Sequence, residues 1–259
     1  MNMSGLAQAW LPLSVLLLLA VVAWALSVKM RDVSIVDSLW SIFFIVFTGL
    51  FAWRTGSDTT AAYVLIALIV LWGLRLSGYI TMRNHGQGED RRYQAIRARN
   101  QPNFEFKSLY LIFILQMVLA TVIVLPVVPI LNGAQDANLL TYAGFAVAAF
   151  GALFETIADA QMARYKATRT AQDQVMNRGL WRYSRHPNYF GEATFWWGIW
   201  IASVSMGGAW TLFSPLLMTW LLTRVSGVPL LEADLQQRSQ AYRDYLQTTP
   251  RFFPGRPKR

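Results

Sequence analysis

Long apolar runs, each close to the length that crosses a bilayer, recur along this chain of 259 residues. A helix needs about 20 predominantly apolar residues to span the hydrocarbon core. Only 14% of the residues are charged, whereas a soluble domain carries about a quarter. The sequence therefore predicts an all-α integral membrane protein with seven transmembrane helices. They are expected at Trp10–Val28, Ile35–Trp53, Thr60–Tyr79, Leu109–Leu131, Leu139–Ala160, Asn188–Val204 and Gly208–Val225.

Lysine and arginine alternate between dense and empty connections along these helices. The third connection, the fifth connection and the C-terminal tail are each rich in them, whereas the fourth and sixth connections contain none. Cytoplasmic loops of membrane proteins carry such an excess. The alternation predicts that the N-terminus lies outside and the C-terminus inside. The net charge of +9 then reflects membrane orientation, and no nucleic-acid partner is expected.

Other features of the sequence limit its organisation and chemistry. No repeat or linker divides the chain, so we expect a single domain over residues 1–259. Pro126 and Pro129 are expected to kink the fourth helix without ending it. The chain has no cysteine and only two distant histidines, His85 and His186, so no metal site is expected. No obligate protein partner is inferred.

The segment 179–192, with the sequence GLWRYSRHPNYFGE, places polar groups at the mouth of a hydrophobic helix. Pro187 suits the first turn of a helix, whose positive end then points at the preceding Arg/His cluster. Such an arrangement favours an anion, most commonly phosphate. A charged anchor at the lipid headgroups is the structural alternative, but an anchor needs neither His-Pro-Asn nor a downstream glutamate. The residues in question are Arg182, Arg185, His186, Asn188, Tyr189 and Glu192.

Ionisable residues inside other predicted helices are also functional candidates, because a lone charge is costly there. They are Asp37, Arg75, Glu155, Asp159 and Arg224. Glu155 and Asp159 are four residues apart and share one face of the fifth helix. Structural alternatives stay open: an interhelical ion pair between Asp37 and Arg75, and an interfacial face for Glu155 and Asp159 that reaches water. The glycine-rich and charged loop 84–103 is expected to form a polar cover beside the third helix.

Together these motifs resemble the steroid 5-alpha-reductase superfamily, and most closely its bacterial branch of the domain-of-unknown-function type (DUF1295). The resemblance rests on segment 179–192 with Glu155 and Asp159 upstream and LTRVSGVP (222–229) downstream. LWGLRL (71–76) and GEDRRY (88–93) also match that branch. The resemblance covers most of the chain.

The resemblance implies a seven-helix membrane reductase that binds NADPH from the cytoplasmic side. Such an enzyme reduces a carbon–carbon double bond conjugated to a carbonyl in a lipid, for example a 3-oxo-4-ene steroid. The cofactor-binding half is expected at about residues 139–259. The expected cofactor-binding residues are Arg75, Glu155, Asp159, Arg182, Arg185, His186, Asn188, Tyr189, Glu192 and Arg224.

The substrate half departs from the steroid enzymes, which carry a Gln-Glu pair on the second helix and a catalytic Tyr on the third. Here Asp37 is the nearest acidic group and Trp72 occupies the Tyr position. A tryptophan N–H donates a hydrogen bond but does not deliver a proton as a phenol does. The expected catalytic residues are Asp37, Tyr79 and Trp72. Asp37, kept neutral by desolvation, would donate a hydrogen bond to the substrate carbonyl, with Tyr79 as the second candidate donor.

Two other functions stay open. A membrane methyltransferase of the isoprenylcysteine carboxyl or phospholipid type, which uses S-adenosylmethionine, also carries Arg-His-Pro followed by Tyr and Gly. The many arginines exceed what a cationic sulfonium needs and favour the reductase. A non-catalytic lipid-binding or scaffold protein would bind no nucleotide and tolerate Arg185→Ala and Asn188→Ala. For the reductase we expect a lipid-like substrate that enters from the bilayer, surrounding membrane lipids, and a bacterial inner-membrane location with the cofactor site facing the cytoplasm.

Overall fold

The computed structural model describes residues 8–133, 136–169, 174–225, 227–228, 232 and 240–258. Within these ranges the secondary structure consists of helices alone. Six helices in this part of the chain are long and apolar enough to cross a membrane. The prediction of an all-α chain with the helices of an integral membrane protein is confirmed. Ser226 and Pro229 of the predicted motifs, and Arg238 of the tail, lie outside the described residues.

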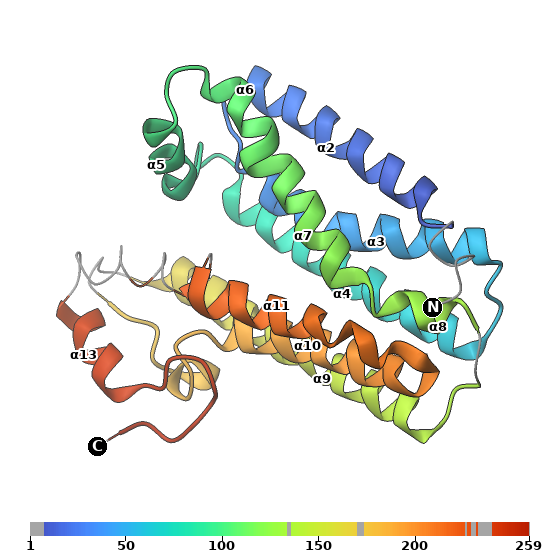
Figure 1. The fold of residues 1–259 in the computed structure, drawn as a ribbon. Coiled ribbons are helices and arrows are strands. Elements are labelled where there is room, and N and C mark those ends of the chain that lie inside the picture. The colour runs from blue at the N-terminus through green and yellow to red at the C-terminus, as the bar shows by residue number, and fades with distance from the viewer. Residues whose placement is uncertain are drawn as a thin grey trace. The chain divides into compact units, whose positions relative to one another are not determined.

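The chain divides into two compact units (Figure 1). The first comprises Met1–Tyr142 and Ala202–Ser214, and the second comprises Ala143–Ile201 and Pro215–Arg259. The division after Tyr142 lies close to residue 139, where the cofactor-binding half is expected to begin. The role of that half, and the action of the whole chain as one domain, remain predictions.

The first unit is built around α3 (Ile35–Thr55), which packs against α2 (Trp10–Met30), α4 (Thr60–Asn84) and α7 (Leu115–Val124). The buried face of α3 carries Phe43, Phe44, Phe47 and Phe51. The α3 and α4 backbones approach closely, since Ser41 Oγ donates a 2.8 Å hydrogen bond to the carbonyl of Gly73. This contact holds the middle of α4 against the second turn of α3, close to several predicted site residues.

The fourth membrane helix ends earlier than predicted. It begins with α6 (Phe104–Ser108), continues through η1 (Leu109–Ile114) and ends with α7 at Val124. A turn then leads into the short α8 (Val127–Leu131). Pro126 has no backbone N–H, and its ring conflicts with the carbonyl four residues earlier. The expectation that the prolines kink this helix without ending it is therefore wrong.

The second unit contains α9 (Leu139–Thr168) and α10 (Pro187–Ser203) with their backbones in contact. A Cβ atom added at Gly151 would lie 2.4 Å from Phe195 N, and one added at Gly198 would lie 2.3 Å from Ala148 N. Only glycine fits at such distances. The close contact brings the face of α9 that carries Glu155 and Asp159 against the first turns of α10.

The apolar stretch Pro187–Val225 contains a reversal of the chain. After α10, η3 (Val204–Gly208) includes non-helical backbone at Met206 and at Gly207, where φ is 82°. The chain then passes through η4 (Ala209–Leu212) into α11 (Phe213–Trp220) and η5 (Leu221–Val225). Trp197 Nε1 donates a 3.1 Å hydrogen bond to Thr219 Oγ1. α10 and α11 therefore lie side by side, as Figure 1 shows.

Candidate functional site

The loop before α10 is held by hydrogen bonds against the C-terminal part of α9. Its turn η2 (Gly179–Arg182) starts at Gly179, whose φ of +57° favours glycine. Leu180 N donates to Gln161 Oε1 at 2.9 Å, and Trp181 Nε1 donates to Ala158 O at 3.0 Å. These bonds hold the loop, and the residues that follow it, next to the acidic face of α9.

Arg185 and His186 meet one buried carboxylate, that of Glu232. His186 Nε2 lies 3.0 Å from Glu232 Oε1, and Arg185 Nε lies 3.2 Å from the same oxygen. Arg251 Nε lies 3.7 Å from Glu232 Oε2. The His186 ring also stacks on Tyr189, with ring centroids 5.5 Å apart. The predicted residues Arg185, His186 and Tyr189 are thus brought together directly at the start of α10.

This cluster, the Glu232 cluster, has an excess of positive charge. Burial lowers the pKa of His186 below its usual value of 6.5, and the charges of Arg185 and Arg251 lower it further. The hydrogen bond and charge of Glu232 oppose that shift only in part. His186 is therefore neutral at neutral pH. One carboxylate then faces two guanidinium groups beside the positive end of α10. Such a site favours an anion.

Asp159 and Asn188 meet where α9 touches the first turn of α10. Asn188 Nδ2 donates a 3.2 Å hydrogen bond to Asp159 Oδ1. Asn188 Oδ1 is buried and accepts no hydrogen bond from the described residues. The close helix contact continues at Gly191, where an added Cβ would lie 2.6 Å from Glu155 N.

The acidic pair on α9 is not an interfacial face. Glu155 is only 2% exposed and Asp159 only 3%, and Glu192 on α10 is also buried. The structural alternative in which Glu155 and Asp159 reach water is therefore wrong. Buried carboxylates of this kind need partners, and all three have contacts within the protein.

The C-terminal tail closes over the loop before α10. Pro250 O accepts a 2.9 Å hydrogen bond from Arg185 N, and Phe252 O accepts a 2.8 Å bond from Ser184 Oγ. Tyr245, on α13 (Gln240–Thr248), donates its hydroxyl to Trp181 O. Glu232 and Arg251 are not among the predicted site residues. In the sequence, Arg251 is only one of several basic residues in the tail, and no motif connects Glu232 with the loop before α10.

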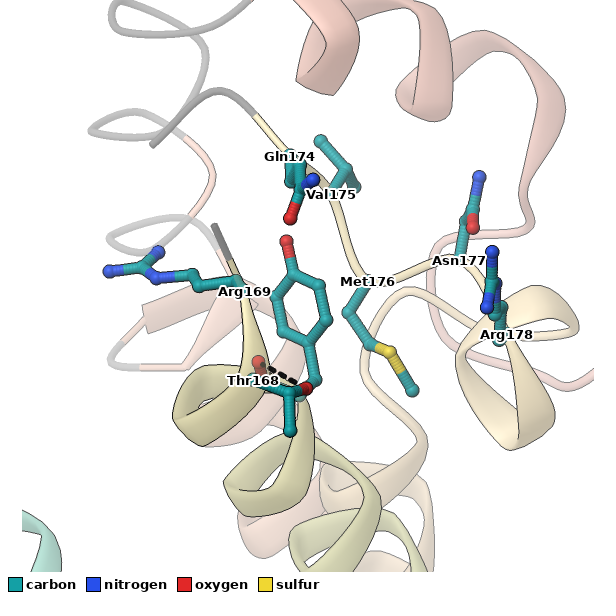
Figure 2. A pocket seen from close by; sticks show the side chains of 8 residues that line it. Thr168, Arg169, Gln174, Val175, Met176, Asn177 and Arg178 are labelled. Carbon is teal, nitrogen blue, oxygen red and sulfur yellow. Dashed lines mark hydrogen bonds between the residues drawn. The ribbon is translucent and has the colours of Figure 1, made fainter. Parts of the chain in front are cut away.

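Two hollows in the second unit adjoin this loop. The first, of about 360 Å³, lies beyond the end of α9 (Figure 2). It is lined by Tyr165, Thr168, Arg169, Gln174, Val175, Met176, Asn177 and Arg178. The second, of about 440 Å³, shares Val175 and Asn177 with the first and is also lined by the predicted residue Arg182. Both hollows are open to the surface rather than enclosed.

Other predicted cofactor residues lie elsewhere. Arg224 is exposed at the end of η5, and within the described residues it forms no ion pair with the Glu232 cluster. Arg75 belongs to α4 of the first unit, where it is half-buried and has contacts within the protein. No group of three or more His, Cys, Asp or Glu residues that could hold a metal ion is present in the described parts of the chain.

In the first unit, the predicted polar cover contains α5 (Arg91–Arg99), which docks on the start of α3 through Asp37. Asp37 Oδ2 accepts a 2.8 Å hydrogen bond from Arg92 Nη2, and Asp37 Oδ1 accepts a 2.6 Å bond from the Tyr93 hydroxyl. Asp90 N donates to Ser34 Oγ at 2.7 Å. Asp37 therefore serves as a hydrogen-bond acceptor with a cationic partner, and not as the neutral donor expected from the sequence.

A second pair reinforces this docking. Glu89 accepts hydrogen bonds from Val33 N at 3.1 Å and from Arg97 Nη2 at 2.7 Å. Although burial pushes the pKa of Glu89 up, the bonds from Arg97 and Val33 and the Arg97 charge hold it below its usual value of 4.5. The same holds for Asp90, where the hydrogen bonds and charge of Arg92 outweigh burial and lower the pKa. Glu89 and Asp90 are therefore ionised at neutral pH.

Tyr93 is not among the predicted catalytic residues, but it is the buried phenol of this group of Asp37, Glu89, Asp90, Arg92, Tyr93 and Arg97, the α3–α5 cluster. Burial raises the pKa of Tyr93 well above 10, and the charge of Asp37 and the hydrogen bond to it raise the pKa further. The phenol therefore keeps its proton, which it shares with Asp37. GEDRRY (88–93) indicated a polar cover, but the sequence does not show that Tyr93 folds back onto Asp37.

The two other predicted catalytic residues lie on α4. Trp72 is buried in the apolar core, with its ring edge-on to Phe44 at a centroid distance of 5.6 Å. Tyr79 is half-buried near the end of the helix. Close to it, Thr81 Oγ1 donates a 2.9 Å hydrogen bond to Ser38 Oγ, next to Asp37. The end of α4 therefore lies beside the start of α3, whereas Trp72 occupies a packing position.

The fold and this site define a helical membrane protein with a partly buried, net-positive cluster at the start of a late helix. A family model described as "Protein of unknown function (DUF1295)" matches residues 23–249, and the chain belongs to this family. Searches among curated proteins and among solved structures found no significant match.

Proposed function

We propose that this protein is an NADPH-dependent membrane oxidoreductase that reduces a carbon–carbon double bond conjugated to a carbonyl in a lipid. The observation that carries the proposal is the Glu232 cluster, in which one carboxylate faces the guanidinium groups of Arg185 and Arg251 at the start of α10. Planar guanidinium groups and a helix N-terminus both suit phosphate. NADPH presents a pyrophosphate and a 2′-phosphate, whereas S-adenosylmethionine presents a sulfonium cation.

Other groups in the second unit fit the same cofactor. Asn188 Oδ1 is a buried acceptor that an N–H or hydroxyl donor of the cofactor would satisfy. Asp159, which accepts from Asn188 Nδ2, would orient that amide. Arg182 lines the open hollow of about 440 Å³ beside the same loop, where its guanidinium group would be accessible to a nucleotide. In this proposal Arg185 and Arg251 hold phosphate oxygens, and Glu232 fixes the Arg185 side chain.

When bound, NADPH would supply the hydride. The protein's part is to position the substrate and to stabilise the negative charge that develops on its carbonyl oxygen. Tyr79 remains the predicted donor to that oxygen. Asp37 accepts from Arg92 and from the Tyr93 hydroxyl, so its predicted catalytic role becomes that of positioning the Tyr93 phenol, which keeps its proton. Trp72 would contribute a wall to the apolar core. An apolar substrate would reach these groups from the bilayer.

We also propose seven membrane spans with the N-terminus outside and the C-terminus inside the bacterial inner membrane, so that the cofactor site faces the cytoplasm. The stretch Pro187–Val225 has 39 residues, about 58 Å if it were one straight helix and nearly twice the hydrocarbon thickness. Its reversal at Gly207 favours two spans. Because the chain lacks cysteine, Asp58→Cys should react with an impermeant thiol reagent on intact cells, and Gln101→Cys only after permeabilisation, since both positions are exposed.

The function is tested by the thermal stability of the purified protein in detergent, with NADPH, NADH and S-adenosylmethionine added separately. A ligand that binds only the folded state, present at a hundred times its Kd, stabilises by about 2.7 kcal/mol. We expect stabilisation by NADPH that Arg185→Ala removes and that the exposed-arginine control Arg91→Ala retains.

Each alternative gives a different result in the same experiment. Stabilisation by S-adenosylmethionine instead of NADPH would overturn the reductase and identify a methyltransferase. No response to any of the three ligands, together with tolerance of Arg185→Ala and Asn188→Ala, would indicate a lipid-binding or scaffold protein.

A further inference from the structure

Arg251 is the most accessible cation of the Glu232 cluster. Its side chain is 41% exposed, compared with 10% for Arg185. Its Nε atom lies 3.7 Å from Glu232 Oε2, too far for a hydrogen bond. No other hydrogen bond to the Arg251 side chain occurs among the described residues. The guanidinium group therefore retains its donors for a further acceptor.

The position of Arg251 is built into the fold. The residues on both sides of it are clamped to the loop before α10: Pro250 O accepts from Arg185 N, and Phe252 O accepts from Ser184 Oγ. The Phe252 ring is buried and packs edge-on against Phe190 of α10, with centroids 6.0 Å apart. These contacts on both sides hold the Arg251 backbone in place beside the loop before α10.

The negative charge of Glu232 mainly compensates that of Arg185. Arg185 is the more deeply buried guanidinium, and a buried cation without a counter-charge is strongly destabilising. Its 3.2 Å distance to Glu232 is also shorter than that of Arg251. Of the two guanidinium charges that face Glu232, that of Arg251 is therefore the less compensated, and Arg251 lies beside the loop that leads into α10.

We infer that Arg251, carried by the C-terminal tail, binds a phosphate group of the nucleotide cofactor and so makes the tail part of the cofactor site. This inference rests on the proposed function and adds a residue that no sequence motif assigns. Arg185 and the α10 N-terminus provide the inner side of the phosphate site, and Arg251 provides its solvent side.

The test compares Arg251→Gln with Arg256→Gln. Arg256 is exposed on the same tail, so its variant removes the same charge without touching the cluster. NADPH binding is titrated with the purified protein through cofactor fluorescence. Loss of one charged hydrogen-bonding group predicts that Arg251→Gln weakens the Kd about tenfold and that Arg256→Gln leaves it unchanged. Equal effects of the two variants, or none, would overturn the inference and leave the NADPH proposal standing.

A second measurement uses the wild-type chain and does not depend on the folding of a variant. Phenylglyoxal modifies exposed arginines, and mass spectrometry reports the modified fraction of each one. NADPH should protect Arg251 and leave Arg256 reactive, whereas equal reactivity of Arg251 with and without NADPH contradicts the inference. If the wild-type protein binds no NADPH in the titration, both the proposed function and this inference fail.

Discussion

The α3–α5 cluster of the first unit and the Glu232 cluster of the second both set carboxylates against guanidinium groups, but in opposite ratio. In the first, three carboxylates from Asp37, Glu89 and Asp90 surround Arg92 and Arg97. In the second, Glu232 alone faces Arg185 and Arg251. Each cluster holds a segment outside the membrane helices against a helix end.

The ratio of carboxylates to guanidinium groups distinguishes a cluster that only holds helices together from one that has donors left for a ligand. In the α3–α5 cluster every guanidinium has a carboxylate within 3.0 Å, so the charges are used within the protein. In the Glu232 cluster one guanidinium is left at 3.7 Å. A shortage of carboxylate leaves donors and net positive charge available, which is what phosphate recognition requires.

The largest expected effect is that of Glu232→Gln. It leaves the buried Arg185 without its carboxylate and should destabilise the ligand-free protein by about 3 kcal/mol. A bound phosphate then replaces the missing charge, so NADPH should raise the Tm of this variant more than that of the wild type. Thermal unfolding with and without NADPH measures both quantities. A variant that loses stability and gains no larger response to NADPH would place the Glu232 cluster among purely structural networks.

Asp37→Ala should lower the free energy of unfolding by less than Glu232→Gln and should leave NADPH binding unchanged. It removes the acceptor of Arg92 and Tyr93, but Arg92 keeps its ion pair with Asp90 at 3.0 Å. We expect a loss of about 2 kcal/mol in the free energy of unfolding, with an unchanged Kd for NADPH. Denaturant unfolding and fluorescence titration provide the two values. A weakened Kd at normal stability would break the distinction between the two clusters.

Tyr93→Phe should have a smaller effect still. It deletes one hydrogen bond to Asp37 and leaves the Asp37–Arg92 ion pair in place. The free energy of unfolding should fall by about 1 kcal/mol. If Tyr93 also acts on the substrate, kcat falls while the KM for NADPH stays constant. Tyr110→Phe, at an exposed tyrosine of the same unit, is the matched control and should change neither quantity.

The smallest expected effect is that of pH. Acidification should lower the stability contributed by the Glu232 cluster at a higher pH than that contributed by the α3–α5 cluster. Folding lowers the pKa of His186, which is surrounded by Glu232, Arg185 and Arg251. The unfolded chain therefore binds a proton first, and stability present above pH 6.5 declines as the pH falls through that value. Glu89 also has a lowered pKa, so its contribution is lost only below pH 4.5. Tm measured from pH 8 to pH 4 should show the first decline, and His186→Gln should remove it.

Much of the fold follows from the local pattern of this sequence. Apolar length alone predicts helices close to α2, α3, α4 and α10, because each side chain contributes independently to burial or lipid contact. The polar segment before α10 is likewise visible as Arg185, His186 and Asn188. The early end of α7 was missed, because a proline in an apolar run can either kink or end a helix and the neighbouring packing decides which.

The partners of the site residues depend on the tertiary structure. The sequence by itself determined that Arg185 and His186 stand at the start of a helix and that Asp37 is an unusual charge in an apolar segment. Only the fold decided that Glu232 and Arg251, 46 and 65 residues beyond His186, meet that helix start, and that Tyr93 returns to Asp37. Ion pairs and hydrogen bonds depend on distances of a few ångströms, and those distances are set by packed helices and clamped loops rather than by spacing along the chain.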